Sequence, residues 1–235
     1  MRSLVDSIQS LSASLLVALT VTATNGVPSA YAQDDLGDQP AQIAGDTSGF
    51  YVTGAAGANW PTMRTNSGDL GTFEEFSNPG IALELGAGYD FGAIRLEATY
   101  ALDTSYLKGY NSVDGIYFDY SSGGRTQKNS AFLSGYWDLL ASKSWTPYLG
   151  AGIGYSHLYV QPFAEPGRSY AGVSQSLLGY QFKAGVSVDI GADDALFAEA
   201  VYRGTSRFST NDGFATWNNG SFGSWGGQLG VRIGL

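Results

Sequence analysis

The sequence contains no cysteine and only one histidine, His157, among its 235 residues. The absence of cysteine excludes disulfide bonds, and a single histidine excludes the usual Cys/His zinc sites. Charged residues are also scarce, at 14%, and they sum to a net charge of −9 without any basic cluster. This balance makes nucleic acid an improbable partner, and the aspartates and glutamates lack the spacing of a calcium loop. We therefore expect no metal and no cofactor.

Glycine, in contrast, is abundant. The chain has 33 glycines, roughly twice the number that an average domain of this length carries. Glycine inside a helix costs about 1 kcal/mol relative to alanine, so this density disfavours a helical bundle. Because 14% of the residues are aromatic, disorder is disfavoured as well. The composition favours a β-rich architecture.

The N-terminal region has no apolar run long enough to cross a bilayer as a helix. The run Ala13 to Ala23 follows the basic Arg2 and precedes Ala30-Tyr31-Ala32, which has the small-x-small pattern of a cleavage site. We predict that residues 1–32 are a secretory signal peptide; an uncleaved membrane anchor is the alternative. Residues 33–48 are polar and acidic, and we predict a flexible periplasmic leader there. Residues 49–235 form the remaining domain.

This domain alternates apolar residues with small or polar ones, which is the period of a β-strand with two different faces. Eight alternating segments are predicted, at about 49–60, 80–90, 93–103, 128–140, 145–159, 176–190, 194–207 and 222–235. Short turns at 90–93, 141–144 and 191–194 alternate with long, irregular connections at about 61–79, 104–126, 160–175 and 208–221. Antiparallel pairing of neighbours would place all the short turns at one end. The prediction is an all-β fold, an eight-stranded antiparallel up-and-down transmembrane β-barrel.

A membrane barrel points its apolar face outward, whereas a soluble barrel points its apolar face into the core. The polar face is mostly small residues with few charges, which would fill a narrow lumen better than it would cover a soluble surface. The apolar face carries aromatic residues near the segment ends, as expected for interfacial girdles. The predicted girdle comprises Trp60, Tyr89, Tyr100, Trp137, Trp145, Tyr155, Tyr202 and Trp225. The last segment runs to the final residue, so we expect it to pair with the first segment and remove both sheet edges.

Three stretches, GFYVTGAAGANW from Gly49, LFAEAVYRG around Glu199 and the closing GGQLGVRIGL, resemble a known family. It is the family of small eight-stranded outer-membrane barrels of the opacity-protein and OmpA-transmembrane-domain type. The resemblance implies the outer membrane of a diderm bacterium, contact with its lipid and lipopolysaccharide, and insertion by the barrel-assembly machinery. It also implies a C-terminal assembly signal at Val231, Ile233 and Leu235, although the family usually ends on phenylalanine.

Charges of both signs fall on the face predicted to point into the lumen. Because a single buried ion is costly, we predict a network of ion pairs. Its members would be Glu84, Arg95, Glu97, Asp138, Lys183, Glu199, Arg203 and Arg232, with Asp90 and Asp189 on the same face. An eight-stranded barrel has an interior just filled by side chains, so the lumen is expected to be closed. A narrow porin or permeation channel is the alternative.

The sequence offers no catalytic arrangement. His157 follows Ser156 directly in a predicted strand, so the two side chains point to opposite faces, and we predict that the chain is not an enzyme. Aromatic residues in the long connections are candidate contacts for an unidentified extracellular ligand: Tyr110, Tyr117, Phe118, Phe163, Tyr170, Phe214 and Trp217. Alternatively, these rings pack on one another or on lipopolysaccharide sugars. The predicted function is a monomeric structural or surface-interaction protein, with a soluble lipocalin-like carrier as a further alternative.

Overall fold

The computed structural model describes residues 48–139, 145–191, 193–211 and 216–235. The predicted signal peptide, nearly all of the predicted leader and the candidate contact Phe214 lie outside the described residues. Within the described part of the chain, no helix is long and apolar enough to cross a membrane.

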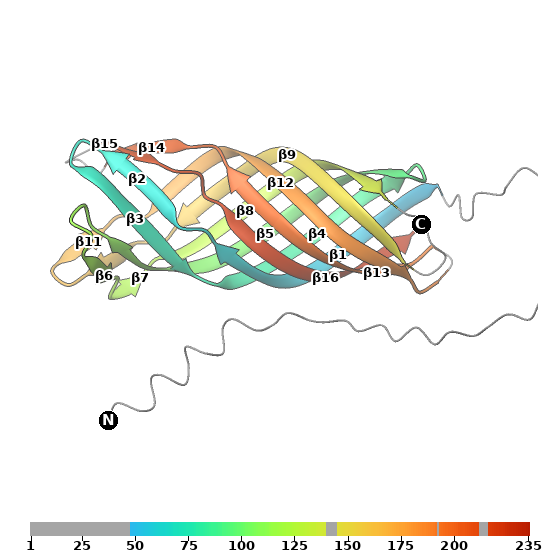
Figure 1. The fold of residues 1–235 in the computed structure, drawn as a ribbon, viewed down its shortest axis with the longest axis horizontal. Helices are drawn as coiled ribbons and strands as arrows, with labels where there is room; N and C mark the ends of the chain where they lie inside the picture. Colours follow the sequence, from blue (N-terminus) through green and yellow to red (C-terminus); the bar gives the residue numbers. More distant parts are fainter. Residues whose placement is uncertain (1–47, 140–144, 192, 212–215) are drawn as a thin grey trace, which may run out of the picture. The chain divides into compact units, whose positions relative to one another are not determined.

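Eight long antiparallel strands form a closed barrel (Figure 1), which confirms the predicted fold class. They are β1 (Gly49–Pro61), β4 (Gly80–Asp90), β5 (Ile94–Asn111), β8 (Arg125–Asp138), β9 (Thr146–Val160), β12 (Val173–Asp189), β13 (Ala195–Thr205) and β16 (Ser224–Gly234). Each strand pairs with both of its neighbours, and β1 closes the ring by pairing with β4 on one side and β16 on the other. Closure leaves the barrel wall without a free edge.

The connection between β4 and β5 is a tight turn at the barrel end that carries Gly49 and Leu235. Between β4 and β5, the backbone NH of Phe91 donates to the carbonyl of Ile94 over 2.9 Å, and the NH of Gly92 donates to the Asp90 carboxylate over 2.8 Å. Gly92 adopts a φ of 99°, a conformation that favours glycine. The predicted turn at this position is therefore explained by its own residues.

The prediction of irregular long connections is wrong: their described residues contain eight further strands. These are β2 (Arg64–Gly68), β3 (Gly71–Asn78), β6 (Tyr117–Asp119), β7 (Ser122–Gly123), β10 (Phe163–Glu165), β11 (Arg168–Tyr170), β14 (Phe208–Asn211) and β15 (Thr216–Asn219). They gather at the end opposite the β4–β5 turn (Figure 1). They pair with one another and with residues 106–111 of β5. Seven of these segments have only two to five residues, and the eight residues of β3 do not alternate between apolar and polar, which explains the error.

The barrel turns its apolar face outward. Leu85 on β4 is 67% exposed, whereas its neighbour Glu84 is 4% exposed and points into the lumen. On β1 the outward positions run from Phe50 to Trp60. No outward position of the eight strands between these two levels is Asp, Glu, Lys or Arg. This is the reverse of a water-soluble barrel, which would bury its leucines and expose its charges.

Candidate functional site

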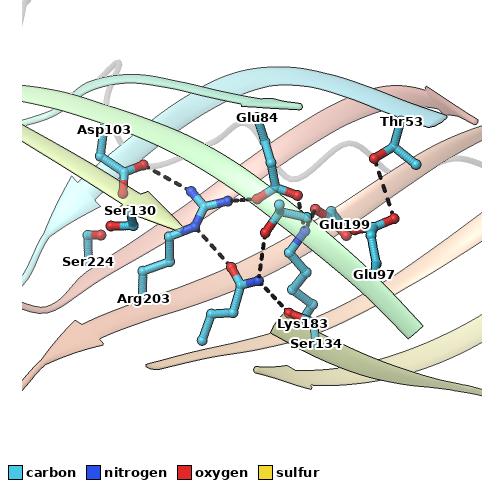
Figure 2. A network of polar contacts seen from close by, with 12 residues as sticks. Thr53, Glu84, Glu97, Asp103, Ser130, Ser134, Lys183, Glu199, Arg203 and Ser224 are labelled. Atoms are coloured by element: carbon cyan, nitrogen blue, oxygen red, sulfur yellow. Dashed lines mark hydrogen bonds and ion pairs between the residues drawn. The ribbon is translucent and has the colours of Figure 1, made fainter. Parts of the chain in front are cut away.

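The centre of the lumen is filled by an ion-pair network built on Arg203 of β13. Its guanidinium lies between two carboxylates (Figure 2): Nη1 donates to Asp103 of β5 over 2.9 Å, and Nη2 donates to Glu84 of β4. Its Nε donates to the amide oxygen of Gln181 over 3.2 Å. Arg203 is therefore held from three other strands while only 1% exposed, as expected for a buried ion that must be paired.

Two lysines complete this network. Lys183 of β12 contacts Glu84 and lies 2.9 Å from the carboxylate of Glu199, which also accepts a hydrogen bond from Tyr148 over 2.9 Å. Lys128 of β8 lies 3.4 Å from Asp103. Each of these carboxylates contacts at least one cation, so the barrel interior is closely balanced in charge at this level.

Some predicted network members lie apart from this centre. Arg95 forms a two-point ion pair with Asp138 of the neighbouring strand, at 2.8 and 3.1 Å. Glu97 accepts hydrogen bonds from the hydroxyls of Tyr136 at 2.9 Å and Thr53 at 3.4 Å, and no ion pair links it to a cation among the described residues. Hydroxyl groups, not a basic side chain, therefore hold this carboxylate.

Two charges predicted on the lumen face form no ion pair among the described residues, although one of them, Arg232, lines a lumen cavity as predicted. Arg232 lies over the ring of Tyr51, 5.8 Å from its centroid, and forms no ion pair among the described residues. Asp189 is exposed at the end of β12. Both stand within four residues of a strand end, where side chains reach water and pairing is no longer required.

Asp103 and Lys128 are network members that were not predicted from the sequence. Asp103 lies in step with Arg95 and Glu97 on β5, every second residue, but the predicted strand ended at about Asp103. Lys128 was placed at the very start of its predicted segment. The structure extends β5 to Asn111 and begins β8 at Arg125, which puts both side chains well inside the barrel. Following the alternation to the terminal residues of the two predicted segments would have found them.

An apolar cluster lies between the ion pairs and the long connections. It consists of Leu107, Leu158, Val160, Leu177 and Phe222, which are all at most 7% exposed. Tyr120, Phe163, Val173 and Phe208 pack against it. We call these five buried residues the apolar seal. An unpaired ion is costly to move into such an apolar environment.

Below the seal the lumen is also nearly full. A cavity lined by Thr53, Glu97, Lys183 and Arg232, among others, has a volume of about 20 Å³. A volume of this size holds roughly one water molecule. The side chains around this cavity therefore leave room for little more than one water molecule.

The predicted girdle residues all lie on the outer wall. Trp60, Trp225, Tyr202 and Phe182 occupy directly opposed positions on the consecutive strands β1, β16, β13 and β12. The rings of Tyr202 and Trp225 are 4.9 Å apart. At the turn end, Tyr89 packs against Phe50 at 4.9 Å and against Phe91 at 4.6 Å, two aromatic residues that the predicted girdle did not include.

The two aromatic levels have the separation expected for a membrane. Phe50 and Trp60 lie ten residues apart on β1. At about 3.3 Å per residue and a typical strand tilt of about 40°, they are separated by roughly 25 Å along the barrel axis. An apolar band of about 25 Å is typical of outer-membrane barrels. Val231, Ile233 and Leu235 lie on the outer wall near the aromatic level of Phe50. There the NH of Leu235 donates to the carbonyl of Phe50 over 2.9 Å.

Most of the candidate ligand contacts in the long connections pack against one another. Tyr110 and Tyr170 both donate to Glu165, over 2.8 and 2.6 Å, and burial together with this carboxylate raises the pKa of each phenol. The ring of Phe163 stacks on Tyr170 at 4.9 Å, and the ring of Trp217 contacts Phe73 at 5.1 Å.

Only two of the predicted contacts that the structure describes are exposed, Tyr117 and Phe118, each at 42%. Tyr117 donates to Asp119 over 2.8 Å, and burial with this hydrogen bond raises the pKa of Tyr117 to about 12. Most of these aromatic residues therefore stabilise the connections, and this pair is the part left open to a partner.

His157 lies on the outer wall and contacts two serines that the sequence analysis did not consider. Its Nδ1 is 3.3 Å from the hydroxyl of Ser176, and its Nε2 is 3.4 Å from the hydroxyl of Ser174, both on β12. None of the hydrogen bonds found in the described ranges joins His157 to a carboxylate, so nothing orients the ring as in a catalytic triad. The same ranges contain no group of three His, Asp or Glu side chains able to hold a metal ion.

The chain matches no protein-family model and no curated protein. Among solved structures it is similar to the outer-membrane protein OprG from Pseudomonas aeruginosa, with a TM-score of 0.56 and 12% identity over 81% of this chain and 99% of that one. It is also similar to Neisserial surface protein A, with a TM-score of 0.49 and 22% identity over 80% and 98% of the two chains. The likeness to OprG shows that the fold is that of an outer-membrane β-barrel.

Proposed function

We propose that this chain is an integral outer-membrane protein of a diderm bacterium, exported by the signal peptide at 1–32 and anchored by the barrel from Gly49 onward. The observation that carries the proposal is the inverted distribution of polarity. The outward face has no charged residue between its two aromatic levels, whereas the lumen contains eight ion-paired side chains around Arg203 and Arg95. A water-soluble carrier would have to expose that apolar wall to solvent.

We further propose that the protein works as a closed barrel. A role in envelope structure or in surface interaction, through the connections at the outer end, fits the filled interior. The ion pairs and the apolar seal both lie across the axis, which disfavours the alternative of a permeation channel. Contacts with lipopolysaccharide and with the barrel-assembly machinery belong to the same proposal, as does a monomeric state.

The absence of cysteine allows a direct test of the topology. Single cysteines would be introduced by Ser67→Cys and Ser209→Cys in the long connections and by Ala93→Cys in a tight turn, all at exposed positions. Intact cells producing each variant would be treated with a membrane-impermeant maleimide. We expect labelling of the first two variants in intact cells and of Ala93→Cys only after the envelope is opened, with the unsubstituted protein as an unlabelled control.

Labelling of Ala93→Cys in intact cells would invert the proposed orientation. Labelling of all three variants in a soluble periplasmic fraction would contradict membrane insertion altogether.

A further inference from the structure

Above the upper aromatic level, one side of the outer wall changes from apolar to polar. We call this surface the outer collar. It consists of Thr104, Tyr106 and Lys108 of β5, Arg125, Gln127 and Asn129 of β8, His157 and Tyr159 of β9, and Ser174 and Ser176 of β12. The collar contains two permanent cations and no carboxylate.

The strand register places the two cations beside each other. Arg125 lies directly opposite Tyr106, and Lys108 follows two residues later on β5. Lys108 stands where the pairing of β5 with β3 shifts register between Phe76 and Ser77, so it is the unpaired extra residue of a bulge. Both cations are exposed, and Tyr106, which is next to each of them in the strand register, is 53% exposed.

Neither cation is neutralised by the protein. No ion pair involves Arg125 or Lys108 among the residues that the structure describes. The acid nearest to Lys108 in the strand pairing is Asp119, opposite Gly109, and its carboxylate accepts the hydroxyl of Tyr117 over 2.8 Å. The guanidinium and the ammonium are therefore available to an anion from outside the chain.

The lower part of the collar supplies neutral hydrogen-bonding groups. Asn129 accepts from the hydroxyl of Tyr100 over 2.8 Å and from the Gln127 amide over 3.4 Å through the same oxygen, so its NH₂ group remains free to donate. His157 lies between the hydroxyls of Ser174 and Ser176 one strand further on. Amide and hydroxyl groups on neighbouring strands can form hydrogen bonds with the oxygens of a sugar.

The opposite rim of the barrel has the opposite charge. Asp90, Asp189, Asp193 and Asp194 are exposed or half-buried around the tight turns. Among the residues described there, Arg95 is buried in its pair with Asp138, and Arg232 is half-buried over Tyr51. Among the residues that the structure describes, exposed cations thus lie at the end that the proposed orientation places in the outer leaflet.

We infer that the outer collar binds a phosphorylated glycolipid of the outer leaflet, that is, lipopolysaccharide. This inference rests on the proposed membrane location and orientation. Arg125 and Lys108 bind a phosphate group through charge-assisted hydrogen bonds, for which a guanidinium is geometrically well suited. Asn129, Gln127 and the serine hydroxyls below contact the sugar to which the phosphate is attached, while the acyl chains lie along the apolar wall.

The test uses the full barrel, folded in a zwitterionic detergent, with lipid A as the probe. Native mass spectrometry would count retained lipid for bisphosphorylated and for dephosphorylated lipid A. We expect the bisphosphorylated form to be retained and the double variant Lys108→Gln/Arg125→Gln to bind it about 30-fold more weakly. Two basic residues near an anionic lipid surface contribute about 1 kcal/mol each, which corresponds to that factor.

The matched control is Arg168→Gln, which removes an exposed cation on β11 whose guanidinium lies over Tyr170, 5.0 Å from the ring centroid. Equal loss of lipid in this control would overturn the site, because only general charge would then be acting. Equal retention of dephosphorylated lipid A would overturn the phosphate contact in favour of acyl-chain docking. Displacement of bound lipid by inorganic phosphate at low millimolar concentration would overturn the lipid as the ligand.

Folding of each variant is checked by its heat-dependent mobility in gels. Failure of lipid binding in a barrel that is folded and correctly labelled at Ser67→Cys would overturn this inference alone, and the proposed membrane location would stand.

Discussion

Arg203 of β13 and Glu84 of β4 form an ion pair across the lumen, although their strands are separated in the barrel wall by β16 and β1. The guanidinium also binds Asp103 of β5, so a single side chain links three strands. Neighbouring strands are already held by their backbone ladders. This pair adds a connection between walls that the ladders do not join directly.

We expect Arg203→Met to destabilise the barrel by about 3 kcal/mol, because removing one partner of a buried ion pair leaves charge uncompensated. Glu84 and Asp103 would retain only Lys183 and Lys128 as cationic partners. The free energy of unfolding would be measured by urea titration in detergent micelles. Adding Glu84→Gln to this variant should recover part of the loss, because Lys183 would still pair with Glu199 and Lys128 with Asp103. The exposed control Arg207→Gln should change stability by less than about 0.5 kcal/mol. Equal stability of Arg203→Met and the unsubstituted barrel would contradict the role of the network.

We expect a charged residue on the outward face to destabilise the barrel in a membrane. Leu85 lies opposite Gly54 on β1, midway between Phe50 and Trp60, and is 67% exposed on the outer wall. In a bilayer we expect Leu85→Arg to cost about 2–4 kcal/mol, since an arginine at the midplane of a barrel must leave water. Reversible folding into lipid vesicles would measure this cost. Ser67→Arg in a long connection is the control, and a similar cost at both positions would contradict a lipid-facing wall.

The hydroxyl of Tyr117 and the carboxylate of Asp119 give the outer end an alkaline titration. Burial and the hydrogen bond to Asp119 raise the pKa of Tyr117 to about 12, above the usual value of about 10 for tyrosine. The phenol keeps its proton more strongly in the folded state. Its stabilising contribution is therefore complete below pH 10 and is lost as the pH rises from about 10 to about 12. Ultraviolet titration of tyrosinate should show one fewer late-titrating group in Tyr117→Phe.

Asp119→Asn provides the check on this cause. Without the carboxylate, the pKa of Tyr117 should move back toward its ordinary value while the tyrosine itself remains. If Asp119→Asn and the unsubstituted barrel give the same tyrosinate titration curve, the hydrogen bond does not set the pKa of Tyr117.

The barrel could be predicted from the sequence because alternation is a property of single strands. Leu83 and Leu85 on one face of β4, with Glu84 between them, already define the two sides of the wall. Partners across the lumen could not be predicted, since alternation places Glu84 and Arg203 inside but says nothing of which opposing strand each one reaches. The apolar seal was missed because Leu107, Leu158 and Phe222 lie where the predicted strands ended or had already passed into the connections.

The apolar seal and the ion pairs make separate predictions about conductance. In a planar bilayer the unsubstituted barrel should show no steady single-channel conductance, because an ion would have to cross both the dry layer around Leu158 and the paired charges around Arg203. The double variant Leu158→Ser/Phe222→Ala removes much of the seal but leaves the network in place, so it should also remain closed. Adding Arg203→Ser removes the cation that spans the lumen, and only this triple variant should conduct. Steady conductance of the unsubstituted barrel would contradict the closed lumen. Conductance of the double variant would show that the seal alone blocks the path and that the network serves stability only.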